Sequence, residues 1–365
     1  MKNKVSIILA MLSVAATLTA SADERTEVDG AVFTMNNSSN ENQVLVFHRG
    51  ENGALTFASE VSTLGLGTGA GLGSQGGLVL SEGHQWLFAV NAGSHEISVF
   101  KVFPEGIILV DKVDSGGLNP ISLTSSGNLL YVLNSDGNVG GADNITGFAV
   151  NSHGQLHQIP GSQAGLSGAA TSPAQVGFSP DGKVLVVTEK TTSLIDTFAL
   201  DNQGVPVQHK IFQSPGTEPF GFAFDQRDHL FVTEAPGSAV SSYSVSEDGE
   251  LTIISKSVPD NQKAACWMAI TKNGQFGYDA NAAANTTSGY QIARDGSINL
   301  LNADGVTGVT GAGPNDLTFS EDSRNLYTLN TKDGSISVFS VNANGSLGSG
   351  TPVTVPVGSD GVAAY

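Results

Sequence analysis

The sequence contains one unit that is repeated seven times. In each unit a glycine closes a short polar turn, and these glycines lie 45 to 53 residues apart at Gly53, Gly106, Gly154, Gly204, Gly249, Gly296 and Gly345. A repeat of this length with strand patterns inside it is typical of a β-propeller. The sequence therefore predicts an all-β fold, a seven-bladed β-propeller of four-stranded blades.

The fourth unit shows the expected strands most clearly. We predict its strands over residues 174–178, 184–188, 194–200 and about 207–212. Pro180 and Gly182 make a tight turn between the first two, because proline fixes φ and glycine accepts a positive φ. The second strand (VLVVT) is rich in β-branched residues. The other units have the same order of strands and turns.

The two ends of the chain predict how the ring closes. Residues 31–35 (AVFTM) look like the second strand of a blade and have no first strand before them. Residues 361–365 (GVAAY) look like a first strand with nothing after them. We expect this C-terminal strand to pair with the N-terminal one, which removes the open edge of the array.

The first 22 residues have the features of a cleaved signal peptide. Lys2 and Lys4 form a basic start, Val5–Leu18 is mostly apolar, and the small residues 20–22 precede Asp23. A membrane anchor is the alternative, but the apolar run is short. The prediction is a single propeller domain over 23–365, located in the periplasm or secreted.

Charge and cysteine content narrow the classes of partner. Without Lys2 and Lys4, fourteen basic residues face 34 acidic ones, a formal charge of −20. This disfavours nucleic acid and anionic membrane surfaces, which are bound through lysine and arginine. Cys266 is the only cysteine, so the chain cannot form an internal disulfide. We expect a monomer without a membrane anchor, and a buried thiol rather than a nucleophile.

The short sequence motifs of the repeat resemble those of a known family. The pattern of PDGK at 180–183, VLVVTE at 184–189 and DGEL at 248–251 is similar to that of the lactonase-type seven-bladed propellers. These include bacterial 6-phosphogluconolactonase and fungal carboxymuconate lactonizing enzymes. The resemblance extends from about Ala31 to Tyr365, and it implies a lactone as substrate.

The sequence departs from that family at the expected site. The family has a histidine at the start of the inner strand of the third blade, with arginines nearby for an anionic substrate, whereas residues 118–122 read LNPIS. Strand order places four arginines away from the ligand-binding face: Arg49, Arg227, Arg294 and Arg324. Arg25 precedes the first blade. A phosphorylated or tricarboxylate lactone is therefore not the expected substrate.

The predicted site lies where loops precede the inner strands and follow the second strands, which we call the ligand face. Glu189 and Glu234 occupy equivalent positions in neighbouring blades, and Glu218 precedes the inner strand of the Glu234 blade. We predict that these three carboxylates are catalytic, with one as a general base of raised pKa. Two alternatives are a divalent cation bound by Glu and Asn oxygens, and solvated residues that hold loop backbone.

Further polar and aromatic residues are expected around these carboxylates. The predicted substrate-binding residues are Asn91, Asn119, Gln175, Trp267, Asn315 and Asn330. Trp267 either stacks on a sugar ring or fills the channel. The glycine-rich residues 65–77 have no strand–helix context for a phosphate cradle, and they are predicted to be a flexible loop between blades.

Two functions follow from this pattern. The first is an exported lactonase that hydrolyses a neutral or sugar-derived lactone by carboxylate-assisted attack of water. The second is a non-catalytic secreted propeller that binds a carbohydrate or protein partner. The missing histidine and arginines favour the second, and the family resemblance favours the first.

Overall fold

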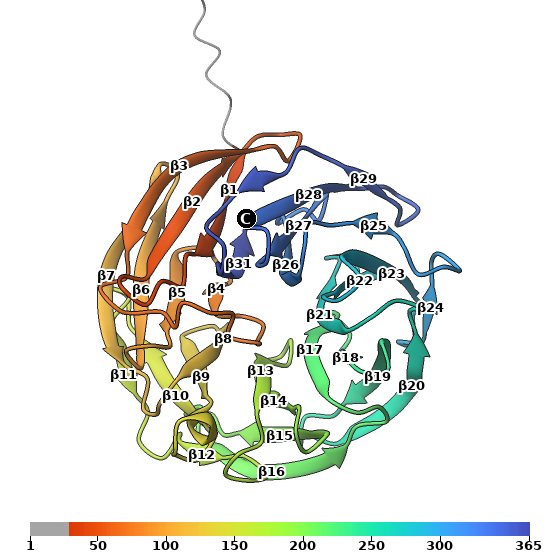
Figure 1. Ribbon diagram of the computed structural model, residues 1–365. Coiled ribbons are helices and arrows are strands. Elements are labelled where there is room, and N and C mark those ends of the chain that lie inside the picture. Colours follow the sequence, from red (N-terminus) through yellow and green to blue (C-terminus); the bar gives the residue numbers. More distant parts are fainter. Residues whose placement is uncertain (1–28) are drawn as a thin grey trace, which may run out of the picture.

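The computed structural model describes residues 29–365, which form seven antiparallel sheets arranged in a ring around an axis (Figure 1). This confirms the predicted seven-bladed propeller. The proposed signal peptide, residues 1–22, and Arg25 lie outside the described residues. Among the residues that are described, no helix is long and apolar enough to cross a membrane.

Each blade is named here from its innermost strand outwards. Blade 1 contains β31 (Asp360–Ala364), β1 (Gly30–Met35), β2 (Gln43–Arg49) and β3 (Leu55–Ser62). Blade 2 contains β4 (Leu78–Leu80), β5 (Trp86–Asn91), β6 (Glu96–Phe103) and β7 (Gly106–Asp114). Blade 4 contains β13 (Pro173–Phe178), β14 (Val184–Glu189), β15 (Leu194–Leu200) and β16 (Pro206–Gln213). Blade 5 contains β17 (Pro219–Phe224), β18 (His229–Glu234), β19 (Ala239–Val245) and β20 (Leu251–Pro259).

In the other three blades the outermost strand is split into two short segments that pair with the same third strand. Blade 3 contains β8 (Pro120–Ser126), β9 (Leu129–Asn134), the 3-10 turn η1 (Asp136–Asn138), β10 (Asn144–Val150), β11 (Leu156–Gln158) and β12 (Ala164–Gly165). Blade 6 contains β21 (Ala265–Ile270), β22 (Phe276–Asn281), β23 (Thr286–Ile292), β24 (Ile298–Leu300) and β25 (Gly308–Val309). Blade 7 contains β26 (Pro314–Phe319), β27 (Asn325–Asn330), β28 (Ser335–Val341), β29 (Leu347–Ser349) and β30 (Val353–Thr354).

The ring closes as the two chain ends predicted. β31 pairs antiparallel with β1, with Phe33 opposite Ala363. The C=O of Tyr365 accepts hydrogen bonds from the N–H of Ala31 and from Nε of Arg49, at 3.2 and 3.1 Å. The innermost strand of blade 1 is therefore supplied by the C-terminus, and no blade has an unfilled inner position.

The repeated glycine turns join each blade to the one before it. The buried Tyr131 hydroxyl in β9 donates to the C=O of Gly204 in the next blade at 2.5 Å, and Tyr278 in β22 donates to Gly345 in the same way at 2.7 Å. At Gly154, where φ is +81°, a Cβ would lie 2.5 Å from the ring of Trp86. Glycine is required there by both the backbone conformation and the packing.

Candidate active site at the ligand face

The glycine-rich segment 65–77, which we call the strap, runs across the centre of the ligand face instead of looping between two blades. Ser74 Oγ donates to the C=O of Ile121 in β8 at 2.7 Å, and the N–H of Gln75 donates to the C=O of Ala174 in β13 at 3.2 Å. The expected flexible loop is thus a segment held by the inner strands of other blades, and Figure 1 shows it reaching inward beside β8.

The Gln75 side chain bridges to a blade that is not next to its own. Gln75 precedes β4 of blade 2, and its amide pairs with Met268 in β21 of blade 6. Nε2 donates to the Met268 C=O at 2.9 Å, and Oε1 accepts from the Met268 N–H at 3.1 Å. Only 8% of Gln75 is exposed. The amide therefore pairs with the backbone of β21 across the axis, as a residue of a neighbouring strand would.

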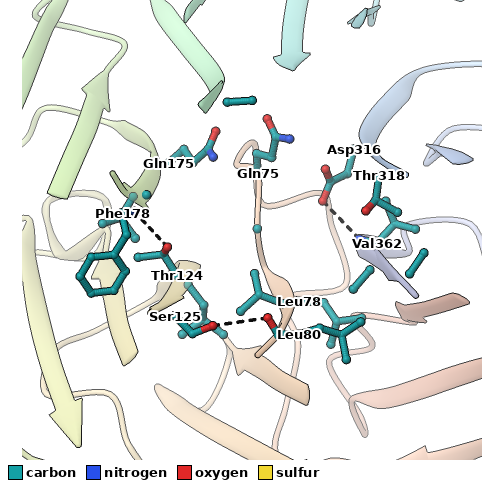
Figure 2. A pocket seen from close by; sticks show the side chains of 18 of the residues that line it. Gln75, Leu78, Leu80, Thr124, Ser125, Gln175, Phe178, Asp316, Thr318 and Val362 are labelled. Carbon is teal, nitrogen blue, oxygen red and sulfur yellow. Dashed lines mark hydrogen bonds between the residues drawn. The ribbon is translucent and has the colours of Figure 1, made fainter. Parts of the chain in front are cut away.

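Beyond Gln75 the axis contains a cavity of about 460 Å³, which is lined by inner strands and extends to Glu82 in the β4–β5 turn at the opposite face. Figure 2 shows Gln75 and Gln175 side by side at one end of it, with Asp316 beside them. Burial and the nearby Asp360 raise the pKa of Asp316 to about 8. The N–H groups of Leu317, Val362 and Gly76 donate to its carboxyl and partly offset this rise. The strap thus separates this cavity from the ligand face.

Lys190 contacts the strap at the ligand face, and Glu218 is near enough to act on the pKa of Lys190. Nζ of Lys190 donates to the C=O of Gly73 at 2.7 Å and lies 4.7 Å from the centroid of the Phe220 ring. Burial lowers the pKa of Lys190 to about 8, while the nearby Glu218 and Cys266 oppose the shift. A half-buried ammonium beside an exposed carboxylate at the mouth of a channel can polarise a carbonyl.

The backbone of Glu218 has a conformation that glutamate disfavours. Its φ is +50°, and the next residue is the first of β17. The equivalent residues before the inner strands of blades 3, 4, 6 and 7 have φ of +51°, +52°, +61° and +66°, and they are Asn119, Ser172, Ala264 and Gly313. Asparagine and glycine accept this region readily, whereas a glutamate in it is strained. The conformation is a feature of the repeat, and blade 5 carries its cost with a glutamate.

Glu189 and Glu234, the other two predicted catalytic carboxylates, are buried inside their own blades. Glu234 Oε1 accepts from Ser241 Oγ at 2.6 Å and from the N–H of Gly216 at 3.0 Å, and only 1% of Glu234 is exposed. Glu189 is fully buried and accepts the Ser167 hydroxyl at 2.5 Å. The three glutamates bind different partners, so they do not form the single cluster that we expected.

The Glu189 carboxyl makes folding sensitive to pH. Burial and the negative charge of Asp196 raise its pKa from 4.5 to about 7, although Ser167 and Thr192 donate to it. The protonated form is favoured in the folded protein, so this contribution to stability is complete below about pH 4.5 and is lost as the pH rises towards 7. In the wild type, the free energy of unfolding should therefore fall by about 3 kcal/mol between about pH 4.5 and 8. We expect Glu189→Gln to lack this decrease, because glutamine does not titrate.

Urea unfolding of both proteins across this pH range measures the effect. Asp196→Ser is the matched control, because serine occupies the equivalent place in other blades (Ser98, Ser288 and Ser337). It removes the neighbouring charge and should weaken the same pH dependence in part. Parallel stability curves for the wild type and Glu189→Gln would contradict this account.

Three of the predicted substrate-binding residues are buried. Asn91 and Asn330 are fully buried, and their Nδ2 atoms donate to Ser98 and Ser337 at 2.8 and 2.9 Å. Trp267 is 2% exposed, and its Nε1 donates to a backbone C=O in β26. These side chains hold the strand ends together around the ring, and Trp267 fills space between inner strands.

The other three lie half-buried at the inner rim. Gln175 pairs its amide with the backbone of Phe222 at 3.0 and 2.7 Å, and Asn315 donates to the Asp360 carboxylate at 3.0 Å. The N–H of Asn119 donates to Nδ1 of His95 at 2.9 Å. Asn315 thus lies near the strap, because Asp360 also accepts from the N–H of Leu72, whereas Gln175 lines the axial cavity.

The described residues contain no group of three or more His, Cys, Asp or Glu side chains that could hold a metal ion. The four described arginines lie where strand order placed them, away from the ligand face. Arg227 and Arg324 are in the turns before β18 and β27, Arg294 is in the turn before β24, and Arg49 ends β2. The cationic groups of the ligand face are therefore lysines.

Reasoning from the sequence placed Lys190 at the ligand face without choosing it as a site residue, and it predicted that the strap is a flexible loop. One signal was present, because Lys190 occupies the first position after a second strand, where four other units have Ala92, Ser135, Ala235 and Ala282. A long charged residue at a place otherwise filled by small ones indicates a specific contact. No comparable feature of the sequence indicated that the carboxyl pair Asp316 and Asp360 is buried under the strap.

Comparisons agree with this architecture. A family model described as lactonase, seven-bladed β-propeller, matches residues 29–165 and 142–262. This chain belongs to that family of propellers. The membership supports lactone hydrolysis in general. No curated protein matches the chain in sequence.

Solved structures show the same fold at low identity. A candidate 6-phosphogluconolactonase from Bacteroides fragilis is 17% identical, with a TM-score of 0.72 over 93% of this chain and 99% of that one. A periplasmic gluconolactonase from Pseudomonas aeruginosa is 16% identical, with a TM-score of 0.72 over 92% and 98%. A Lactobacillus plantarum protein is 15% identical, with a TM-score of 0.74 over 92% and 99%.

Proposed function

We propose that this protein is an exported hydrolase that opens a neutral or sugar-derived lactone at the ligand face, above the strap. The observation that carries the proposal is the pair formed by Lys190 and Glu218. One is a half-buried ammonium held against Gly73, and the other is an exposed carboxylate on a strained backbone. Glu218 is near enough to Lys190 to act on its pKa, and the family supplies the reaction class.

The chemistry assigned to the pair is attack of water on the lactone carbonyl. The Glu218 carboxylate takes a proton from the water as its oxygen bonds to the carbonyl carbon. The Lys190 ammonium donates a hydrogen bond to the oxyanion that forms. Collapse of the tetrahedral intermediate breaks the ring C–O bond, and the leaving alkoxide receives the proton from Glu218. The product is an open-chain hydroxy acid.

Of the three carboxylates predicted from the sequence, Glu218 receives the catalytic role in this proposal. Glu189 and Glu234 are assigned to positioning, because their oxygens are already bound within blades 4 and 5. Asn315 lies near the strap through Asp360, and the proposal assigns its amide to a substrate hydroxyl. The ligand face has no described arginine, which favours an uncharged ring.

The purified mature protein should hydrolyse neutral sugar lactones at least about tenfold faster than their phosphorylated counterparts, since no arginine fork is present for a phosphate. A pH-stat measurement over a panel of sugar lactones, acyl homoserine lactones and aromatic dienelactones tests this, with and without EDTA. We expect EDTA to leave the rate unchanged. A preference for the phosphorylated lactones would overturn the proposed substrate class.

The alternative function is a non-catalytic propeller that binds a carbohydrate or protein partner at the same face. It becomes the better account if no lactone in the panel is hydrolysed above the buffer rate. Export to the periplasm or the exterior is part of the proposal. It rests on the basic, apolar and small-residue pattern of residues 1–22.

A further inference from the structure

We propose that Gln75 is a positioning residue for Lys190: by tying the strap across the axis of the propeller, it presses the strap onto the Lys190 side chain and keeps water from its ammonium. This inference rests on the proposed function, since it assigns a role to a residue that supports the catalytic pair. It concerns the strap, residues 65–77, and the blades that hold it.

The first step is the way the strap is anchored. Gln75 donates to and accepts from the backbone of Met268, at 2.9 and 3.1 Å, on the far side of the ring. Gly221 in β17 leaves room for this amide, because a Cβ there would lie 2.4 Å from Gln75 Oε1. Ser74 and Leu72 add hydrogen bonds to β8 and to Asp360. The Gln75 contact is the one that spans the axis.

The second step connects this anchor to the lysine. Gly73 lies two residues before Gln75, and its C=O accepts from Lys190 Nζ at 2.7 Å. A Cβ added to Gly73 would lie 3.5 Å from Nζ, so the strap backbone and the ammonium are in direct contact. The Phe220 ring covers the ammonium at 4.7 Å from its centroid. The strap and one aromatic ring together cover part of the ammonium and reduce its hydration.

The charges around the ammonium do not explain its acidity. The titratable groups that act on Lys190 are Glu218, Cys266 and Asp143, and all three raise its pKa, whereas burial lowers it to about 8. Removal of the anchor would hydrate Nζ and relieve the effect of burial. The pKa of Lys190 would then rise towards 10.5, the ordinary value of a lysine.

The test is an NMR titration of the lysine Cε signals in Gln75→Ala, with the Lys190 signal assigned by its loss in Lys190→Met. We expect the midpoint of Lys190 to rise by about one pH unit or more relative to wild type. Gln75→Met, which keeps the length of the side chain but loses both hydrogen bonds to Met268 without adding a charge, provides a second variant if the first fails to fold. Neither titration requires lactone hydrolysis, so failure of the proposed function leaves this test intact.

Gln175→Ala is the matched control. Gln175 makes the same pair of amide hydrogen bonds to the backbone of a neighbouring inner strand, at Phe222, but it does not belong to the strap. It should reduce stability by a similar amount and leave the Lys190 midpoint unchanged. An unchanged midpoint in folded Gln75→Ala and Gln75→Met, or the same shift in Gln175→Ala, would overturn the inference.

Discussion

Replacement of Glu218 by asparagine should make the protein more stable and far less active. The φ of +50° at this position is accepted by asparagine at less cost than by glutamate. We therefore expect the free energy of unfolding to rise by roughly 0.5–1 kcal/mol. The same change removes the carboxylate that accepts the proton of water, and kcat/KM for the best lactone should fall by about 10²–10³-fold.

Two variants separate these effects. Glu218→Gln keeps the strained backbone and the shape of the side chain, so it should lose activity without gaining stability. Ser172→Asn makes the equivalent change before Pro173 in blade 4, where no carboxylate is involved. It should gain stability and keep full activity. Retention of wild-type kcat/KM in Glu218→Asn would remove Glu218 from the mechanism.

Truncation after Ser359 should abolish the cooperative fold. The deleted residues 360–365 form the inner strand of blade 1, where Val362 and Ala363 are buried and Tyr365 stacks on Phe33. Their loss leaves β1 with an unpaired edge facing the axis and also removes Asp360, which holds Leu72 of the strap. The expected cost is comparable with the whole stability of a typical domain, about 5–15 kcal/mol.

Circular dichroism and thermal unfolding measure this loss. Tyr365→Ala is the control, because it keeps the β31 backbone and removes only the ring. It should retain a cooperative transition at a lower temperature. A truncated protein that unfolds cooperatively near the wild-type temperature would show that the C-terminal strand does not close the ring.

The fold could be predicted from the sequence because its determinants are local. A glycine turn such as that at Gly154 and a β-branched strand such as β14 recur in each unit, so seven weak patterns support each other. The closure by β31 followed from counting strands at the two ends. The placement of the arginines followed from strand order alone.

The candidate site depended on contacts that no local pattern contains. Lys190 and Gly73 are 117 residues apart, and their hydrogen bond exists because the strap crosses the axis. Glu189 and Glu234 were correctly placed at strand ends on the ligand face. Their carboxylates are held away from the channel because hydrogen-bond donors such as Ser167 and Ser241 lie beside them.

The central claim is that lactone hydrolysis occurs at the ligand face with Lys190 as an ammonium. It is tested most directly by the pH dependence of kcat/KM for the best neutral lactone, compared between wild type, Lys190→Met and the exposed Lys263→Met. The account predicts that the wild-type rate falls above about pH 8 as the ammonium loses its proton. Lys190→Met should be slower by about 10²-fold, without this decrease, and Lys263→Met should match the wild type. Wild-type activity in Lys190→Met, with the alkaline decrease retained, would contradict the account.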